Sequence, residues 1–191
     1  RLAILGCGEQ AHSHLLAMRA IHPIASAVVW GRNPDHARAF ATANGIEAAA
    51  TVDEAVAEAD IVVTATPAAA PFLHARHLRP GMHVNAVGAS VASMQELAAE
   101  IVPVARFFTD YLPSMEAQAA EVIAARAAGL IGPDHPILEI GAVLNGAPGR
   151  SNPADITLYR SLGIAAQDLA AAHFILAQAE ARGLGTEVEI A

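Results

Sequence analysis

The chain has 191 residues with a net charge of −8, 54% hydrophobic and 16% charged residues, a composition that excludes a disordered chain and predicts one large folded domain. We find neither an apolar run of membrane-spanning length nor a secretion signal, and the 11 basic residues, all Arg, are scattered, so we expect no membrane or nucleic-acid partner. The single cysteine, Cys7, excludes intrachain disulfides and cysteine-rich zinc sites and favours a cytoplasmic location.

Strands and helices alternate along the first 110 residues. Apolar runs predict six strands, at 2–5, 27–30, 46–49, 60–66, 82–87 and 105–110. The intervening helices are expected at 11–20, between Asn33 and Gly45, from Thr51 onward, and at 94–100. This alternation is typical of a Rossmann-type α/β fold, a doubly wound and mainly parallel sheet with helices on both faces.

The pattern is less regular after residue 110. We expect a helix at 115–127, an apolar segment at 156–159 and a long helix at 165–181. That last helix is apolar on nearly all sides, which favours packing against a second domain or another subunit. The segment 187–190 alternates as a half-buried strand does. We therefore predict a Rossmann domain at 1–163, followed at 164–191 by a helix and strand that pack on an N-terminal domain missing from this chain, whose sequence opens abruptly in a strand.

A glycine pattern follows the first strand. Gly6 and Gly8, with Ala11 three residues on, match the dinucleotide fingerprint, in which the first Gly makes a tight turn and the second lets a pyrophosphate approach the backbone. The amino end of the following helix then faces the phosphates. The alternative is a glycine turn that only packs tightly.

The end of the second strand predicts which nicotinamide cofactor binds. It reads Trp30, Gly31, Arg32, Asn33, without the acid that would bind a ribose 2′-hydroxyl and with an Arg that can bind a 2′-phosphate. We therefore expect NADP(H) to be preferred, with NAD(H) possible. The alternative is that Arg32 is a solvated surface residue.

Small residues follow two further strands at the edge where the nicotinamide ring should lie. We expect the ring to lie between two walls, Thr64, Ala65 and Thr66 on one side and Val87, Gly88, Ala89 and Ser90 on the other. Asp110 ends a strand at the same edge and is the candidate catalytic acid or base. The alternatives are ordinary turns for the walls and a helix N-cap for Asp110.

The nine histidines do not predict a metal site. His12 and His14 are two apart on a predicted helix and point in different directions, while His74 and His77 lack a third ligand nearby. His83, on a predicted strand, is expected to be a hydrogen-bonded structural residue. We expect no bound metal.

Several segments together resemble the ornithine cyclodeaminase/mu-crystallin family. They are 6–11 (GCGEQA), 59–62 (ADIV), 80–90 (PGMHVNAVGAS), 95–97 (QEL) and 156–163 (ITLYRSLG), followed by Asp168. The resemblance adds Glu9, Gln10 and Ser161 to the candidate cofactor-binding residues. It implies a nicotinamide-binding domain joined to an N-terminal domain that forms a homodimer and carries substrate-binding Arg and Lys side chains. Because Ser90 stands where cyclodeaminases have an acid, the chain is more similar to the mu-crystallin branch, associated with NADPH and ketimine reduction.

The resemblance therefore implies an NAD(P)-dependent oxidoreductase that acts on the C–N bond of a small cyclic imine or amino acid. Two alternatives stay open. One is an ornithine cyclodeaminase that uses bound NAD without net redox change. The other is a protein that holds the cofactor and a small ligand without turnover, favoured by the stretch 115–121, which lacks the Gly-Asp pair of relatives.

Overall fold

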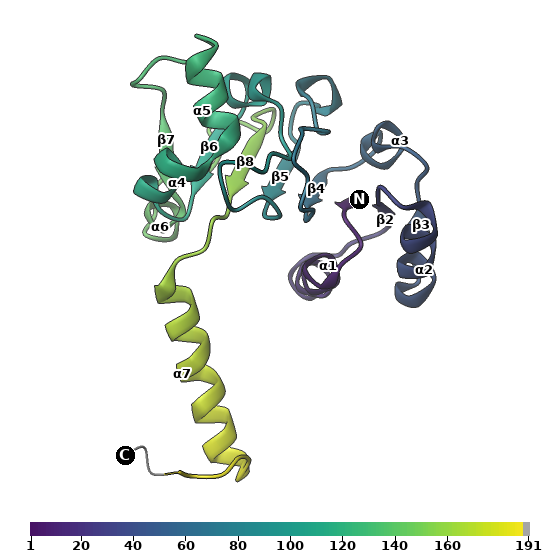
Figure 1. Cartoon of the computed structure of the whole chain (residues 1–191), viewed down its shortest axis with the longest axis vertical. Coiled ribbons are helices and arrows are strands. Elements are labelled where there is room, and N and C mark those ends of the chain that lie inside the picture. Colours follow the sequence, from purple (N-terminus) through teal and green to yellow (C-terminus); the bar gives the residue numbers. More distant parts are fainter. Residues whose placement is uncertain (189–191) are drawn as a thin grey trace.

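The computed structural model, which describes residues 1–188, contains one eight-stranded sheet with the order β3-β2-β1-β4-β5-β8-β6-β7 (Figure 1). All seven strand pairs are parallel. The strands are β1 Leu2–Leu5, β2 Ala27–Trp30, β3 Glu47–Ala48, β4 Ile61–Thr64, β5 His83–Ala86, β6 Arg106–Thr109, β7 Ile137–Glu139 and β8 Thr157–Arg160. The predicted parallel, doubly wound fold is confirmed.

The helices include seven α-helices and two short 3-10 helices among the described residues. They are α1 Glu9–Ile21, α2 Pro34–Asn44, α3 Val52–Val56, η1 Ala75–His77, η2 Ala99–Val104, α4 Leu112–Gln118, α5 Ala120–Ala127, α6 Ile140–Leu144 and α7 Ala165–Arg182. Local sequence fixes α2 most clearly. The side chain of Asn33 accepts hydrogen bonds from the amides of Asp35 and His36, and Gly45 ends the helix at a φ of 61°.

Helices cover both faces of the sheet around β1, because its side chains alternate between them. Leu2 and Ile4 pack in one core cluster with residues of α1 and α2. Ala3 and Leu5 belong to the other cluster, which continues under α3, η2, α4 and α5 as far as β6 and β8. In Figure 1, α1 and α2 accordingly lie on one side of β1, β2 and β4, and α3 on the other. The first cluster reaches only as far as β4 within the described chain.

Two strands complete the sheet beyond the six predicted ones. β8, from the segment left unassigned at 156–159, lies between β5 and β6 and pairs with both. β7 forms the edge next to β6. β8 thus lies in the middle of the sheet although it comes last among the strands in the sequence. Its carboxyl end lies at the same edge of the sheet as the carboxyl ends of β4 and β5.

Three helix and strand predictions need correction. No α-helix covers 94–100, because this segment bonds to another loop instead of to itself: the amide of Gln95 donates to the Ala68 carbonyl, and the Glu96 carbonyl accepts from Phe72 and Leu73. The predicted helix 115–127 is two helices, since Ala119 leaves the helical region at ψ 95°. Residues 187–188 lie in no strand, and the rest of that predicted strand lies outside the described residues.

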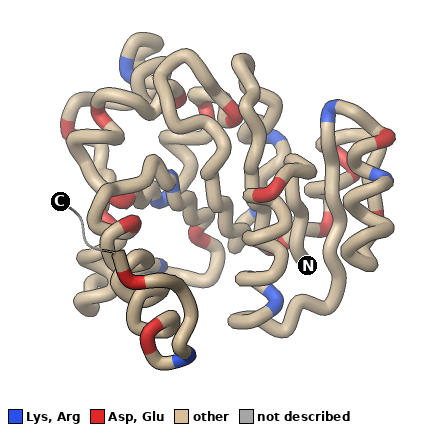
Figure 2. The backbone as a smooth tube through the Cα atoms, turned by 60° about the horizontal axis from the view of Figure 1, so that its bottom comes forward, with Lys and Arg blue, Asp and Glu red and all other residues tan. Residues whose placement is uncertain are grey.

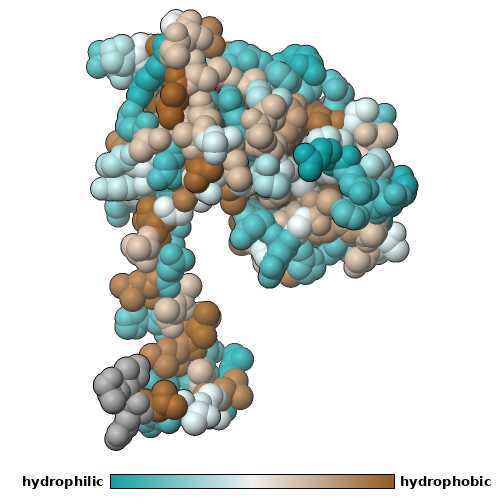
Figure 3. Space-filling view, in the orientation of Figure 1, coloured by the Kyte–Doolittle hydropathy of each residue, from teal (hydrophilic) through white to brown (hydrophobic). Residues whose placement is uncertain are grey.

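The helix α7 projects from the domain (Figure 1). None of its residues is buried. Its apolar side chains Leu169, Phe174, Ile175 and Leu176 are 57% to 67% exposed, and Figure 3 shows apolar patches among polar residues on the projecting helix. None of the helices in the described part of the chain is long and apolar enough to cross a membrane.

Candidate cofactor site

A pocket of about 660 Å³ opens at the carboxyl ends of β1, β2 and β4. From β1 the chain builds the sheet outward through β2 and β3, and then returns to place β4 on the other side of β1. Doubly wound sheets bind their ligands at such a switch point. The lining residues come from the turn after β1, the end of β2 with the start of α2, and the loop after β4: Gly6, Cys7, Gly8, Trp30, Gly31, Arg32, Asn33, His36, Ala65, Thr66, Pro67, Ala68, Ala69, Ala70 and Phe72.

The turn after β1 requires glycine at one position and leaves open space at another. Gly6 has a φ of 130°, and a Cβ there would collide with the carbonyl oxygen of Ala65. Gly8 is the N-cap of α1 and provides no capping side chain, and a Cβ at Gly8 would meet nothing within 4 Å. The first amides of this 13-residue helix therefore face the pocket mouth without a side-chain cap, an arrangement suited to a phosphate.

The other residues of the fingerprint are divided between surface and core. Glu9 and Gln10 are exposed in the first turn of α1, whereas Ala11 is fully buried against the sheet. Ala11 thus has the packing role that the fingerprint assigns to its last position.

The end of β2 makes the pocket basic. Arg32 is exposed and His36 lies on the first turn of α2, and none of the lining residues in the described chain is acidic. A Cβ at Gly31 would lie 2.9 Å from the Cys7 sulfur, so a side chain there would require the Cys7 side chain to shift. Asn33 lines the pocket, and its Oδ1 caps α2 at 2.9 Å from the Asp35 amide. Elsewhere the arginines are single positions interspersed with Asp and Glu (Figure 2).

An aromatic pair forms an apolar wall that sequence reasoning missed. The rings of Trp30 and Phe72 lie 5.3 Å apart at 41° to each other, and both line the pocket together with Pro67 and neighbouring alanines. Aromatic and apolar surface of this kind suits a flat heterocycle. Phe72 follows β4 in a loop without periodicity, so only the fold brings it beside Trp30.

The two predicted nicotinamide walls are joined by a residue to which the sequence gave no role. Glu96 is 1% exposed. Its carboxylate accepts hydrogen bonds from Thr64 and Thr66 at the end of β4, and from the amides of Gly88 and Ala89 after β5. Of the predicted wall residues, Ala65 and Thr66 line the pocket, Val87 and Gly88 are half-buried, and Thr64 and Ala89 are fully buried.

Asp110 follows β6 at the predicted edge and is 8% exposed. Its Oδ2 accepts from the amides of Leu162 and Gly163 at 2.8 and 2.6 Å and lies 3.4 Å from the Ser161 hydroxyl. Its Oδ1 accepts from the Tyr111 amide and the Thr109 hydroxyl. The carboxylate thus joins the loop after β8 to the end of β6, and it brings Ser161 to the candidate catalytic acid.

A buried ion pair lies beneath the loop after β5. Arg160 and Glu121 are each 1% exposed, with 2.9 Å between Arg160 Nε and Glu121 Oε1. Arg160 also donates to the carbonyl oxygens of Ala86 and Ala89. Burial raises the pKa of Glu121, and the charge of Arg160 opposes this effect. Neither residue was singled out from the sequence.

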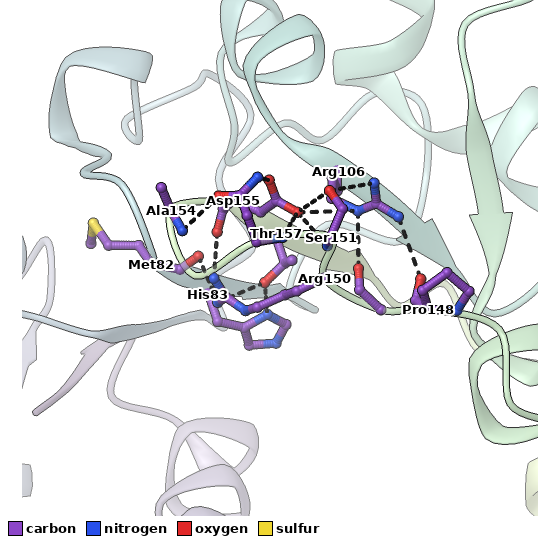
Figure 4. A network of polar contacts seen from close by, with 11 residues as sticks. Met82, His83, Arg106, Pro148, Arg150, Ser151, Ala154, Asp155 and Thr157 are labelled. Atoms are coloured by element: carbon purple, nitrogen blue, oxygen red, sulfur yellow. Dashed lines mark hydrogen bonds and ion pairs between the residues drawn. The ribbon is translucent and has the colours of Figure 1, made fainter.

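The amino ends of β5, β6 and β8, at the end of the sheet opposite the pocket, carry a polar network (Figure 4). There Arg106, the first residue of β6, pairs with Asp155 of the loop preceding β8 at 3.7 Å and donates to the Gly149 carbonyl oxygen. Arg150 donates to the Thr157 hydroxyl. His83 is hydrogen-bonded to Thr157 and Asn85 at 2.8 and 3.1 Å, as a structural histidine should be. A smaller cavity of about 410 Å³ lies at the amino ends of β6 and β7. These contacts hold the sheet on the side away from the glycine turn.

The other histidines do not gather around a common point. His74 pairs with Glu100 at 2.9 Å, and its ring lies 5.7 Å from that of His77. Among residues 1–188, no group of three or more His, Cys, Asp and Glu side chains is placed to hold a metal ion.

The fold and the glycine turn at the switch point define a Rossmann-type domain of the dinucleotide-binding class. The match to known families is more specific. The chain belongs to the ornithine cyclodeaminase/mu-crystallin family, whose model matches residues 1–183.

Three relatives illustrate the range of the family. The mouse ketimine reductase mu-crystallin is 34% identical over 91% of this chain and 54% of its own length. The Thermococcus litoralis Δ1-pyrroline-2-carboxylate reductase, solved with NADH and L-proline, has a TM-score of 0.91 and 30% identity over 98% of this chain and 60% of its own. An archaeal alanine dehydrogenase dimer with bound NAD has a TM-score of 0.90 and 30% identity, covering 100% and 61%. The chain therefore spans somewhat more than half the length of these relatives.

Proposed function

We propose that this chain is the cofactor-binding part of an NAD(P)-dependent oxidoreductase that acts on the C–N bond of a small cyclic imine or amino acid. The observation that carries the proposal is the pocket at the switch point, which combines a glycine turn, an uncapped helix start and an acid-free basic end of β2. Bound there, a nicotinamide dinucleotide supplies a hydride to a C=N bond, or accepts one from a CH–NH group.

Each part of the dinucleotide corresponds to residues of this chain. The amides at Gly8 and the start of α1 face the pyrophosphate, and the Trp30 and Phe72 rings form the apolar wall for the adenine end. The strand ends held by Glu96 flank the nicotinamide end. Asp110 and Ser161 stand at the same edge, where Asp110 is proposed to donate or accept the proton that accompanies reaction at nitrogen.

NADP(H) is the preferred cofactor in this proposal. An exposed Arg32, with His36 nearby and no acid lining the described pocket, favours a 2′-phosphate over a 2′-hydroxyl because a carboxylate would repel the phosphate and a guanidinium can bind it through two hydrogen bonds. Two of the related structures were solved with NADH or NAD. We therefore expect this chain to differ from those two proteins in the residues that bind the 2′ position of the adenine ribose.

The exposed apolar helix α7 is proposed to pack against an N-terminal domain that also forms a homodimer and carries the substrate-binding side chains. Four large apolar side chains of α7 are more than half exposed. Exposed apolar surface of this kind is unusual on a monomer and is typical of an interaction site. Support comes from the relatives, which have further length outside the matched part. The substrate itself is a small imine or amino acid, and a cytoplasmic location remains an expectation from cysteine usage.

Calorimetric titration with NADPH and NADH tests the cofactor assignment. NADPH is expected to bind more tightly, and Arg32→Ala is expected to weaken NADPH about tenfold or more, the effect of losing a charge-assisted pair, while NADH binding stays the same. Arg38→Ala is the matched control, because Arg38 lies on the exposed face of α2 and pairs with Asp35. Equal affinities for both cofactors, unchanged by Arg32→Ala, would refute the assignment.

Turnover distinguishes the three activities. NADPH consumption by the full-length protein in the presence of a cyclic imine is the expected result. Release of ammonia from ornithine without net NADPH consumption would select cyclodeamination instead. Cofactor binding without any turnover, over a panel of cyclic imines and amino acids, would select the non-enzymatic binding protein.

A further inference from the structure

Glu96 lies where two loops at the edge of the sheet meet. Its Oε1 accepts from the Thr66 amide at 2.6 Å and the Thr66 hydroxyl at 2.8 Å. Its Oε2 accepts from the Thr64 hydroxyl at 2.8 Å and from the amides of Gly88 and Ala89 at 2.9 and 3.2 Å. One carboxylate thus accepts five hydrogen bonds, three of them from backbone amides that follow two neighbouring parallel strands.

The contact continues the sheet beyond the point where the strands separate. The last backbone bonds between these segments run from the amides of Val87 and Gly88 to the carbonyl oxygen of Thr64, at 3.0 and 3.2 Å. A Cβ at Gly88 would overlap the backbone of Thr66 and lie 2.6 Å from Glu96 Oε1. The two loops therefore contact each other through their backbones. Beyond that contact, the Glu96 carboxylate provides acceptors for the amides of both loops.

The side chain of Glu96 cannot itself reach a ligand, since the residue is 1% exposed. Its partner Thr66 lines the pocket. The backbone carbonyl of Glu96 accepts from the amides of Phe72 and Leu73 at 3.0 and 3.1 Å, and Phe72 forms the apolar wall. Glu96 therefore acts on the site only through the segments that it holds.

We propose that Glu96 is a positioning residue that sets the spacing of the β4 and β5 loops around the nicotinamide end of the bound dinucleotide, an inference that rests on the proposed function. Five donors converge on it, and an ionised carboxylate offers acceptors alone. A glutamine at this position would place an N–H donor against one of the amide or hydroxyl donors, and the two loops would then move apart. The nucleotide end is formed by the β1 turn, the end of β2 and Phe72. Phe72 bonds to the backbone carbonyl of Glu96 and not to its carboxylate, so a change confined to the carboxylate is expected to leave this end in place.

The test separates the two ends of the ligand. NADPH and 2′-phospho-ADP-ribose, which lacks the nicotinamide ring, are titrated calorimetrically into the wild-type chain and into Glu96→Gln. We expect Glu96→Gln to weaken NADPH binding about tenfold, the effect of one donor left without an acceptor, and to leave the affinity for 2′-phospho-ADP-ribose unchanged. A general loss of structure would lower both affinities together.

Two further variants keep the test decisive. Glu100→Gln is the matched control, because Glu100 is a partly exposed neighbour that pairs with His74, and both affinities should stay at the wild-type values. If Glu96→Gln does not fold, Glu96→Asp retains an acceptor-only group withdrawn by one methylene, and the same selective loss of NADPH affinity is expected, at a smaller factor.

Equal losses for both ligands, or no loss for either, would overturn the positioning role. Failure of the wild-type chain to bind both 2′-phospho-ADP-ribose and ADP-ribose would instead overturn the proposed function, and with it this inference. The wild-type titration thus distinguishes the two failures.

Discussion

Replacing Arg160 with Met should strongly destabilise the fold, because the change leaves a buried carboxylate without its partner. Arg160 and Glu121 are both 1% exposed and in contact at 2.9 Å, and both Glu121 oxygens lack any aligned hydrogen bond. The carbonyl oxygens of Ala86 and Ala89 would also lose the donors that Arg160 provides. Among residues 1–188, Arg160 is the one cation that pairs with Glu121.

The expected cost follows from the depth of burial. Removing one partner of a buried ion pair costs about 3–5 kcal/mol, a large part of the roughly 5–15 kcal/mol by which folded domains are stable. For a chain of this length each kcal/mol corresponds to about 2–4 °C in Tm. Arg160→Met should therefore lower Tm by about 6–20 °C.

Urea unfolding followed by circular dichroism measures this cost. The control is Arg126→Met, which removes an Arg–Glu pair between α4 and α5 whose side chains are 30% and 47% exposed, and whose loss should cost about 0–1 kcal/mol. The double variant Arg160→Met/Glu121→Met, with no charge left to bury, should regain at least about 2 kcal/mol relative to Arg160→Met. A cost below about 1 kcal/mol for Arg160→Met, or additive effects in the double variant, would refute the reasoning.

The pH dependence supplies a second readout. Burial raises the pKa of Glu121, and Arg160 opposes the rise, so removing Arg160 raises the pKa further. The folded state then binds a proton that the unfolded state has released, and the unfolding free energy falls as pH increases above the ordinary carboxyl range. The difference in stability between wild type and Arg160→Met should thus be larger at about pH 8 than at about pH 5.

Two further predictions concern the glycine turn and the polar network. Gly8→Ala should fold with an unchanged Tm, since its added Cβ meets nothing within 4 Å. It should bind NADPH at least about tenfold more weakly, because a methyl group stands where the phosphate approaches. An unchanged affinity by calorimetry would exclude the turn as the phosphate site. Burial lowers the pKa of His83, so the unfolded state binds more protons near neutral pH, and stability should fall as pH drops through about 6.5. His83→Gln should flatten this slope in urea titrations between about pH 7.5 and 5.5, and an undiminished slope would exclude His83 as its source.

Local signals determined the amino-terminal half of the fold. The boundaries of α2 are those expected from Asn33, Pro34 and Gly45, because caps and proline act within a few residues of the chain. The strand, glycine turn and helix around Gly6 were likewise predictable, since the turn needs a residue that tolerates a φ of 130°. The parallel fold class followed from alternation alone.

The arrangement at the carboxyl edge depends on contacts between distant residues. β8 enters between β5 and β6, pairing Tyr159 with Asn85 and Phe108, and nothing in its four residues indicates that place. The Glu96 carboxylate bonds to Thr66, 30 residues earlier, which is why its segment forms no α-helix although its sequence permits one. Asp110 bonds to Gly163, 53 residues later.

The sequence by itself thus determined the fold class, the glycine turn and the family, because short-range backbone preferences and motif spacing carry that information. Only the tertiary structure decided which side chains share the site: Trp30 with Phe72, Glu96 with the two loops, and Arg160 with Glu121. The physical reason is that buried polar groups must find their partners wherever the packed chain supplies them, and those partners lie tens of residues away.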